Sequence, residues 1–303
     1  MAISRAQLVK ELEPGLNALF GLEYKRYENQ HAEIYAQESS DRAFEEEVML
    51  SGFANADVKA EGQGINYDEA QETFTARYTN ETVALAFAIT EEAIEDNLYD
   101  RIASRYTKAL ARSMSNAKQV KAVEPLINGL PATATFKTGD GVSLINASHP
   151  TIAGTFSNTL ATASDLNETS LEQSLIDIAK MTDERGLKIA ARGMKMIIPS
   201  ELQFTAERLM KSQGRVGTAD IDINAIKSMG MIPQGYHVNN FLTDSDAFYI
   251  ITDVPNGMKM FNRAPLTTAM EGDFDTGNVR YKARERYSFG CSDPRGIFGS
   301  PGA

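Results

Sequence analysis

Residues Ser170–Met210 read SLEQSLIDIAKMTDERGLKIAARGMKMIIPSELQFTAERLM, and the first half of this stretch predicts a helix. Thr169 and Glu172 fit the Ser/Thr-x-x-Glu capping box, which satisfies two backbone donors where a helix begins. Gly186 is suited to the left-handed conformation that ends many helices. The apolar residues between these signals recur at helical spacing: Leu171, Leu175 and Ile178.

The second half of the stretch predicts a buried strand followed by another helix. Met194–Ile198 is a short apolar run, and Pro199 ends it because proline lacks the donor that a sheet needs. Ser200 and Gln203 form a second candidate capping box. The order helix, strand, helix indicates an α/β unit without a cluster of reactive side chains.

The composition is that of a soluble globular protein: of 303 residues, 42% are hydrophobic and 23% are charged. No apolar run approaches the roughly 20 residues that span a bilayer. Charges at Lys10, Glu11 and Glu13 interrupt any signal-peptide core, so we expect synthesis in a cytoplasm. Cys291 is the single cysteine, which excludes an intrachain disulfide. The three histidines lack metal-ligand spacing: His31, His149 and His237.

The formal net charge of −11 argues against nucleic-acid binding as the main task, because such binding depends on Lys and Arg side chains that neutralise phosphates. An acidic protein can still enclose DNA. A container wall benefits from a weak hold on a polymer that must later leave.

Residues 45–89 predict a long two-stranded ribbon. Apolar residues of its return half alternate with alanines, which is the period of a strand: Val83, Leu85, Phe87 and Ile89. The alternation is weaker in the outgoing half of the ribbon. Gly62 and Gly64 are the natural bend points between the two halves. A ribbon of two strands is marginal alone, so another surface must cover it. The leading segment, residues 1–44, is amphipathic and interrupted at Pro14-Gly15, and we expect an arm that packs on a neighbouring chain.

From Thr90 the pattern changes to that of a long helix, limited by Pro125 and Gly129. Its inward stripe recurs every four residues: Ile94, Leu98, Ile102, Tyr106 and Leu110. Acidic residues follow Thr90 and basic residues lie further on, in agreement with the helix dipole. At 1.5 Å per residue, roughly 30 residues give a helix of about 45 Å, a length typical of an elongated protein.

The end of the chain predicts a hairpin that turns at Asp275–Asn278, with strict alternation in its second strand. One face is apolar apart from Glu285. The other face carries four cations: Arg280, Lys282, Arg284 and Arg286. This basic stripe has three interpretations: contact with DNA, pairing with an acidic surface of another subunit such as Glu45, Glu46 and Glu47, or a solvated face.

Other patterns do not predict chemistry. Asp273–Asn278 resembles a calcium loop, but its glycine is one position early and the twelfth position lacks glutamate. His149-Pro150 follows Ser148 without a nucleophile elbow. The acidic pairs Asp220/Asp222 and Asp244/Asp246 lie in loops. We therefore predict no enzyme, no catalytic residue, no cofactor and no metal.

Residues 167–211, above all TDERGLKIAARGMKMIIPSELQFTAERLM, resemble the major head proteins of tailed phages, which have the HK97 fold, and the Mu-like head subunits in particular. The segment HPTIAGTFSN at 149–158 is similar too. The resemblance implies an α+β fold in five parts: an N-terminal arm at 1–44, an extended hairpin or E-loop at 45–89, a peripheral domain with the spine helix at 90–164, an α/β axial domain at 165–260, and C-terminal strands at 261–303 that return to the peripheral domain.

The resemblance also implies a function: a major capsid protein that assembles through hexamers and pentamers into an icosahedral head around double-stranded DNA. The implied partners are further copies of itself, a separate scaffolding protein, a portal protein, decoration proteins and the enclosed DNA, with no membrane. The implied location is the virion, after synthesis in the host cytoplasm. Some relatives cross-link an E-loop lysine, but no motif marks Lys59, the one lysine of this ribbon. An encapsulin-like cargo shell and a soluble oligomeric α/β enzyme are the alternatives.

Overall fold

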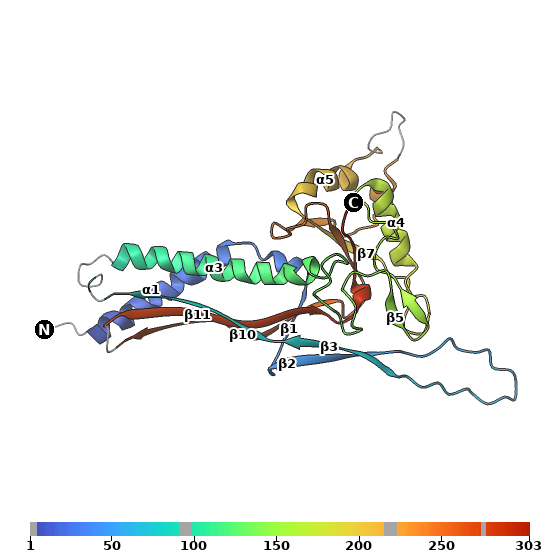
Figure 1. Ribbon diagram of the computed structural model, residues 1–303, viewed down its shortest axis with the longest axis horizontal. Coiled ribbons are helices and arrows are strands. Elements are labelled where there is room, and N and C mark those ends of the chain that lie inside the picture. Colours follow the sequence, from blue (N-terminus) through green and yellow to red (C-terminus); the bar gives the residue numbers. More distant parts are fainter. Residues whose placement is uncertain (1–4, 91, 93–98, 215–222, 274–276) are drawn as a thin grey trace.

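The computed structural model describes residues 5–90, 92, 99–214, 223–273 and 277–303. Two four-stranded sheets organise the chain, one in an elongated part with the longest helix and one in a second part that carries shorter helices (Figure 1). A two-stranded ribbon projects from the junction of these parts, away from the end where the N-terminus lies. As labels, we use peripheral domain for the elongated part and axial domain for the second part.

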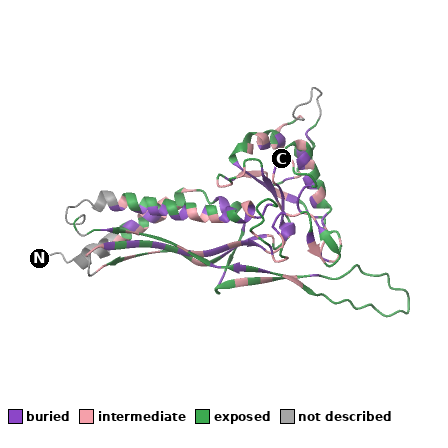
Figure 2. Ribbon diagram, in the orientation of Figure 1, coloured by how far each residue is buried: buried purple, intermediate pink, exposed green. Residues whose placement is uncertain are grey.

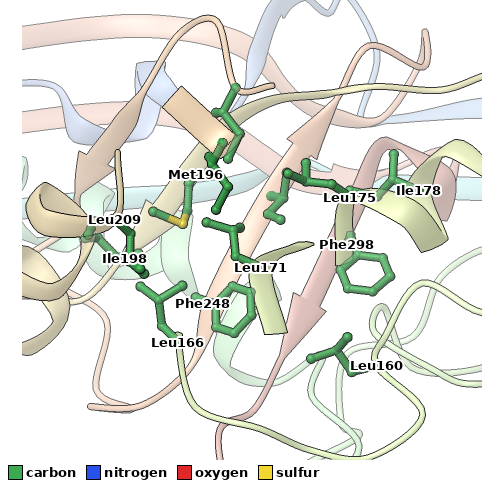
Figure 3. Packing of buried hydrophobic residues seen from close by; sticks show 14 of the residues in the cluster. Leu160, Leu166, Leu171, Leu175, Ile178, Met196, Ile198, Leu209, Phe248 and Phe298 are labelled. Atoms are coloured by element: carbon green, nitrogen blue, oxygen red, sulfur yellow. The ribbon is translucent and has the colours of Figure 1, made fainter. Parts of the chain in front are cut away.

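The axial sheet has the strand order β12-β9-β7-β8. Its strands are β7 (Gly193–Ile198), β8 (Tyr236–Val238), β9 (Phe248–Thr252) and β12 (Ile297–Ser300). Helices α4 (Glu168–Ala179) and α5 (Gln203–Lys211) contribute apolar residues to its core, and α6 (Ala225–Met229) adds Ile226. Leu171 and Ile178 of α4 pack with Phe248 and Phe298 of the sheet (Figure 3). The predicted strand at Met194–Ile198 is therefore confirmed, and so is its end at Pro199.

Both predicted capping boxes are wrong. Helix α4 is capped by Asn167, whose side chain accepts a hydrogen bond from the Ser170 backbone, while the Ser170 hydroxyl accepts one from the Asn167 backbone. The second helix begins with a 3₁₀ turn, η2 (Ser200–Leu202), without a side-chain cap. Gly186 has a positive φ of 83°, but it lies in a later turn and not at the end of α4.

The peripheral sheet has the strand order β1-β10-β11-β4, formed by β1 (Ala36–Ser39), β10 (Met258–Gly272), β11 (Val279–Cys291) and β4 (Glu81–Ile89). Helices α1 (Arg5–Arg26) and α3 (Tyr99–Ile127) lie on one face of it (Figure 1). Leu16 and Phe20 of α1 pack with Met114 of α3 and Tyr281 of β11. The opposite face carries no helix of the same chain in the residues that the structure describes.

The two helices of this domain differ from their predictions in part. Helix α1 continues through Pro14, and its apolar side packs on its own domain, so this arm does not depend on a neighbouring chain to cover Phe20. The spine helix is confirmed over Tyr99–Ile127, with Pro125 in its last turn. Leu110 of its predicted inward stripe is buried, but Tyr106 is 52% exposed, so the stripe is wrong at that position. Its predicted start, with most of the acidic residues after Thr90, lies outside the described residues.

The ribbon consists of β2 (Phe44–Leu50) and β3 (Glu72–Thr79), paired antiparallel, with residues 51–71 as its loop. The predicted strand over Val83–Ile89 exists as β4, but its assignment to the ribbon is wrong. It pairs with β11 in the peripheral sheet, from Val279 opposite Ile89 to Tyr287 opposite Glu81. Only Asn80 separates the ribbon from that sheet. Most of the ribbon is exposed (Figure 2).

A third core joins the two domains, and it includes Leu126 of α3, Tyr249 of β9 and Tyr287 of β11. The final strand β12 pairs with β9 of the axial sheet, so the C-terminal strands do not all return to the peripheral domain as predicted. The remaining elements are short: η1 (Gln30–Glu33), β5 (His149–Thr151), β6 (Gly154–Phe156) and η3 (Pro294–Gly296).

Candidate assembly surfaces

The ribbon loop, residues 51–71, is the most exposed apolar segment. Val58 is 98% exposed and Tyr67 96% exposed, and Ile65 and Phe53 are also exposed. Exposed apolar side chains that lie together can mark a surface that meets a partner. The loop is acidic as well, with four carboxylates against one amine: Asp57, Glu61, Asp68, Glu69 and Lys59.

Hydrogen bonds across the loop use two of these carboxylates. Asp68 accepts from the Ala54 backbone N–H at 2.7 Å, and this hydrogen bond lowers the pKa of Asp68. Asp57 accepts from the Asn66 amide at 3.1 Å. Neither of these two hydrogen bonds involves a cation, although the charge of nearby Arg185 also lowers the pKa of Asp68.

The root of the ribbon is tied to the peripheral sheet by a buried cation. Lys259 of β10 lies 2.5 Å from Glu47 of β2 and 3.0 Å from Glu38 of β1. Burial alone would lower the pKa of Lys259, but hydrogen bonds to the two glutamates raise it above its ordinary value. Ser292 donates a further hydrogen bond to Glu47. Glu47 is thus occupied within its own chain.

Asn80 and Arg185 fix the ribbon at two further points. The Asn80 amide donates to the Ser40 hydroxyl at 2.9 Å and to the Arg42 carbonyl at 3.1 Å, and its oxygen accepts from Ser288 of β11 at 3.0 Å. Arg185 of the axial domain donates to the Glu69 carbonyl at 2.6 Å. These contacts hold the strands of the ribbon while most of the loop projects freely.

The basic stripe is where the alternation predicts it, on the helix-free face of the peripheral sheet. Along β11, Arg280, Lys282 and Arg284 are exposed and Arg286 is half-buried, while the residues between them are buried. Most neighbouring positions on that face are small: Thr82, Ala84, Ala86 and Ala88 on β4, and Thr267 and Ala269 on β10. The exception is Glu271 of β10, which lies opposite Arg280. Arg280 and Lys282 border a pocket on this face, which Ala86, Ala269 and Glu271 also line.

The structure does not bring the stripe together with the three predicted glutamates. Arg280 is paired with Asp273 next to it. Glu45 accepts from Ser40 at 2.8 Å, and Glu46 lies 3.8 Å from Arg77 of the ribbon. Within the part of the chain that the structure describes, no ion pair or hydrogen bond joins these glutamates to β11.

The opposite face of β11 holds a charged group inside the sheet–helix interface. Glu285 lies 3.2 Å from Lys118 of α3 and accepts a hydrogen bond from Tyr24 of α1 at 3.3 Å. Burial raises the pKa of Glu285, and the Lys118 charge offsets this only in part. The sequence places Glu285 among apolar residues, which is the signal for such a buried ion pair, but it does not identify Lys118 as the partner.

His149 begins the short strand β5 and lies in the interior. It is fully buried, with Nδ1 2.6 Å from Asp140 and Nε2 3.2 Å from Asn158.

The acidic pair Asp244/Asp246 lies in a loop, and Asp220/Asp222 falls outside the described residues. Among the described residues there is no group of three or more His, Cys, Asp or Glu side chains that could hold a metal ion. No helix in the described ranges is long and apolar enough to span a membrane.

The solved structures that match this chain have the same overall fold as it does. A chain of Mycobacterium phage Che8 is 14% identical with a TM-score of 0.54, and the match covers 90% of this chain and 92% of that one. The virus-like particle from Pyrococcus furiosus is 11% identical, covers 94% and 97%, and has a TM-score of 0.52. The capsid of Myoviridae phage XM1 is 11% identical, covers 89% of both chains, and has a TM-score of 0.51.

Identities this low show the fold alone, and a comparison with curated proteins finds no match. A family model described as phage capsid protein matches residues 72–299, which is most of the chain. None of these matches singles out the Mu-like head subunits. The chain belongs to the phage capsid protein family, and its α+β fold is the HK97-like fold of capsid subunits.

Proposed function

We propose that the chain is the major capsid subunit of a tailed phage, which assembles through hexamers and pentamers into an icosahedral head that encloses double-stranded DNA. The family match over residues 72–299 carries this proposal. The enclosed DNA is held without sequence-specific contacts, in keeping with a net charge of −11.

The exposed ribbon supports the proposal because a monomer gains nothing from it. Val58, Ile65 and Tyr67 remain in water, and burying a large apolar side chain stabilises a protein by about 1.5–3 kcal/mol. A shell supplies the missing surface on a neighbouring subunit. We assign this ribbon as the E-loop, the α3 part as the peripheral domain, and the α4–β7–α5 part as the axial domain.

The intersubunit contacts that we propose are electrostatic as well as apolar. The basic stripe is one side, namely Arg280, Lys282, Arg284 and Arg286. Glu45 and Glu46 remain candidates for the acidic side, whereas Glu47 is the weakest candidate because Lys259 already pairs with it. The other partners in this proposal are a separate scaffolding protein, a portal protein and decoration proteins. The chain acts as a structural protein and not as an enzyme, is made in the host cytoplasm and ends in the virion.

The test is the mass of the purified chain by light scattering after size-exclusion chromatography, with negative-stain microscopy of any heavy fraction. We expect rings of five or six subunits, or closed shells, on expression with the phage's own assembly proteins. A chain that remains monomeric or dimeric under those conditions would overturn the proposal. Small shells that hold a protein cargo and no DNA would favour the encapsulin-like alternative.

A further inference from the structure

We propose that the pocket between the root of the ribbon and the axial domain binds a small aliphatic polyamine, through carboxylates whose oxygens are not all bonded within their own chain. The pocket measures about 340 Å³, and ligand sites in proteins have volumes of about 300–1,000 Å³. One subunit contains the whole pocket, so no contact between subunits is needed to complete it. The proposal therefore goes beyond the capsid function and does not depend on it.

The pocket brings together three segments that are far apart in the sequence. Leu50 comes from the ribbon root, Asp183 and Ile189 come from the loop after α4, and Asp253 follows β9 directly. Arg295 of η3 also lines the pocket. A molecule bound here would contact both the ribbon and the axial domain.

The pocket is strongly acidic. Four carboxylates line it against one guanidinium: Asp183, Glu184, Asp253 and Asp293, with Arg295. Arg295 lies 2.6 Å from Glu184 and 3.3 Å from Asp293, so two carboxylates share its single charge. Burial raises the pKa of Asp293, and the Arg295 charge offsets this only in part. The lining residues therefore leave an excess of negative charge in the pocket.

Three of these carboxylates each have one oxygen that makes no hydrogen bond within the described chain. Oδ1 of Asp183 accepts from the Leu187 backbone N–H at 2.7 Å, and Oδ1 of Asp253 accepts from the Arg192 backbone N–H at 2.8 Å, whereas their Oδ2 atoms have no partner among the described residues. Glu184 is 3% exposed, and its Oε2 is buried without a partner. Because a buried charged oxygen without a partner is costly, these atoms indicate a site for a donor that this chain does not supply.

The remaining walls of the pocket are apolar and suit a hydrocarbon chain. Leu50 is 64% exposed and Ile189 is 36% exposed, and Val254 also lines the pocket. The methylene groups of a polyamine would cover these side chains, as the stem of a lysine covers apolar surface. Its ammonium groups would donate to the unbonded oxygens of Asp183 and Asp253.

Other ligands fit the pocket less well. The excess of carboxylates would repel a phosphate. A metal ion needs its ligands close together, and the described residues contain no group of three or more His, Cys, Asp or Glu side chains that could hold one. Ammonium groups spaced along a chain match carboxylates that are set apart. The nearby Arg185 does not fill the pocket, because it does not line it and donates to the Glu69 carbonyl of the ribbon at 2.6 Å.

The experiment titrates the purified full chain with spermidine, a linear triamine, and measures binding by isothermal titration calorimetry. The test variant combines Asp183→Asn with Asp253→Asn, because an amide oxygen still accepts the backbone hydrogen bond while the charge is lost. The matched control combines Asp244→Asn with Asp246→Asn, which removes the same charge from a loop where Asp244 also accepts a backbone N–H. A second test variant, Leu50→Lys, leaves the carboxylates intact and places a tethered ammonium group at the pocket.

We expect wild type to bind a single spermidine per subunit, and both test variants to bind it about ten-fold more weakly or worse, because charge pairs in a partly buried site are little screened. The control should bind within about two-fold of wild type, since exposed charges contribute little. Mg²⁺ at the same concentration should not displace spermidine. Thermal melting of each variant without spermidine shows whether it is folded.

Equal weakening in the control and in the Asp183/Asp253 variant would show a general counter-ion effect, and displacement by Mg²⁺ would show a site for any cation. Either result would overturn the proposal, and so would a wild-type chain that does not bind spermidine. In that last case, loss of shells in the Asp183/Asp253 variant but not in the control would assign the carboxylates to a basic side chain of a neighbouring subunit. Binding is measured on the free chain, so a failure of wild type to form shells would contradict the proposed function alone.

Discussion

The axial core and the ribbon loop differ in what covers their apolar side chains. In the core, Leu171 and Phe248 are fully buried among residues of the same chain, whereas in the loop Val58 is 98% exposed. Apolar side chains therefore stabilise the fold in the axial core, whereas those of the ribbon loop are not covered by their own chain. We therefore expect folding to depend on the axial core and assembly to depend on the ribbon loop, and matched substitutions can test this.

The largest effect is expected from Phe248→Ala. Phe248 is fully buried in the axial core, so the variant loses burial and leaves a cavity, at a cost of about 3–5 kcal/mol in the free energy of unfolding. Phe53→Ala is the control in the ribbon loop, where the ring is 60% exposed, and it should change stability by less than about 0.5 kcal/mol. Chemical denaturation of both variants measures the difference. Equal losses would abolish the distinction between the two regions.

The second effect is a dependence of stability on pH, and it comes from His31, which is buried outside the ribbon. Burial, together with the nearby Lys118 charge, lowers the pKa of His31 from 6.5 to about 4. The unfolded chain therefore binds a proton that the folded chain excludes, and stability falls as the pH decreases from 6.5 to about 4, by up to about 3 kcal/mol. His31→Leu should flatten this part of the profile relative to wild type. An unchanged slope in urea titrations across this range would show that His31 is not responsible.

A third effect comes from adding one methyl group. A Cβ at Gly193 would lie 2.9 Å from Leu175 Cδ2 and 3.0 Å from Ile250 Cγ2, so Gly193→Ala overfills the axial core and costs about 1–3 kcal/mol. Gly64→Ala in the ribbon loop meets nothing within 4 Å and should be close to neutral. Thermal melting of the two variants measures this contrast. A destabilised Gly64→Ala variant would indicate that the loop packs on its own body.

The smallest effect on stability, and a large one on assembly, is expected from deletion of residues 55–70. Ser51 and Gln71 already exchange backbone and side-chain hydrogen bonds, so the remaining Gly52, Phe53 and Ala54 can close the ribbon as a short turn. The melting temperature should stay near that of wild type, while closed shells disappear. Intact shells from this deletion would contradict the role assigned to the ribbon.

Local patterns predicted the faces of the elements better than their partners. Alternation along 279–289 gives the buried and basic faces of β11 because the period of a strand depends on the backbone alone. The same alternation in Val83–Ile89 does not tell a ribbon from a sheet, and β4 in fact pairs with β11. The prediction of the capping residue failed where several polar residues compete for that role, since Asn167 and Ser170 lie on either side of Thr169. The pairing of Glu47 with Lys259 joins residues 212 positions apart, and no local signal encodes it.

Asn80 has a mechanical consequence. The return strand of the ribbon becomes β4 after this single residue, and Asn80 is bonded to Ser40, Arg42 and Ser288. The ribbon is therefore anchored at Asn80 and at Lys259, while most of its loop makes no contact with the rest of the chain. A neighbouring subunit that binds the loop, as proposed above, would pull on β4 through Asn80, and thus on β11, which pairs with β4. Tension in the shell would in this way pass into the sheet of each subunit.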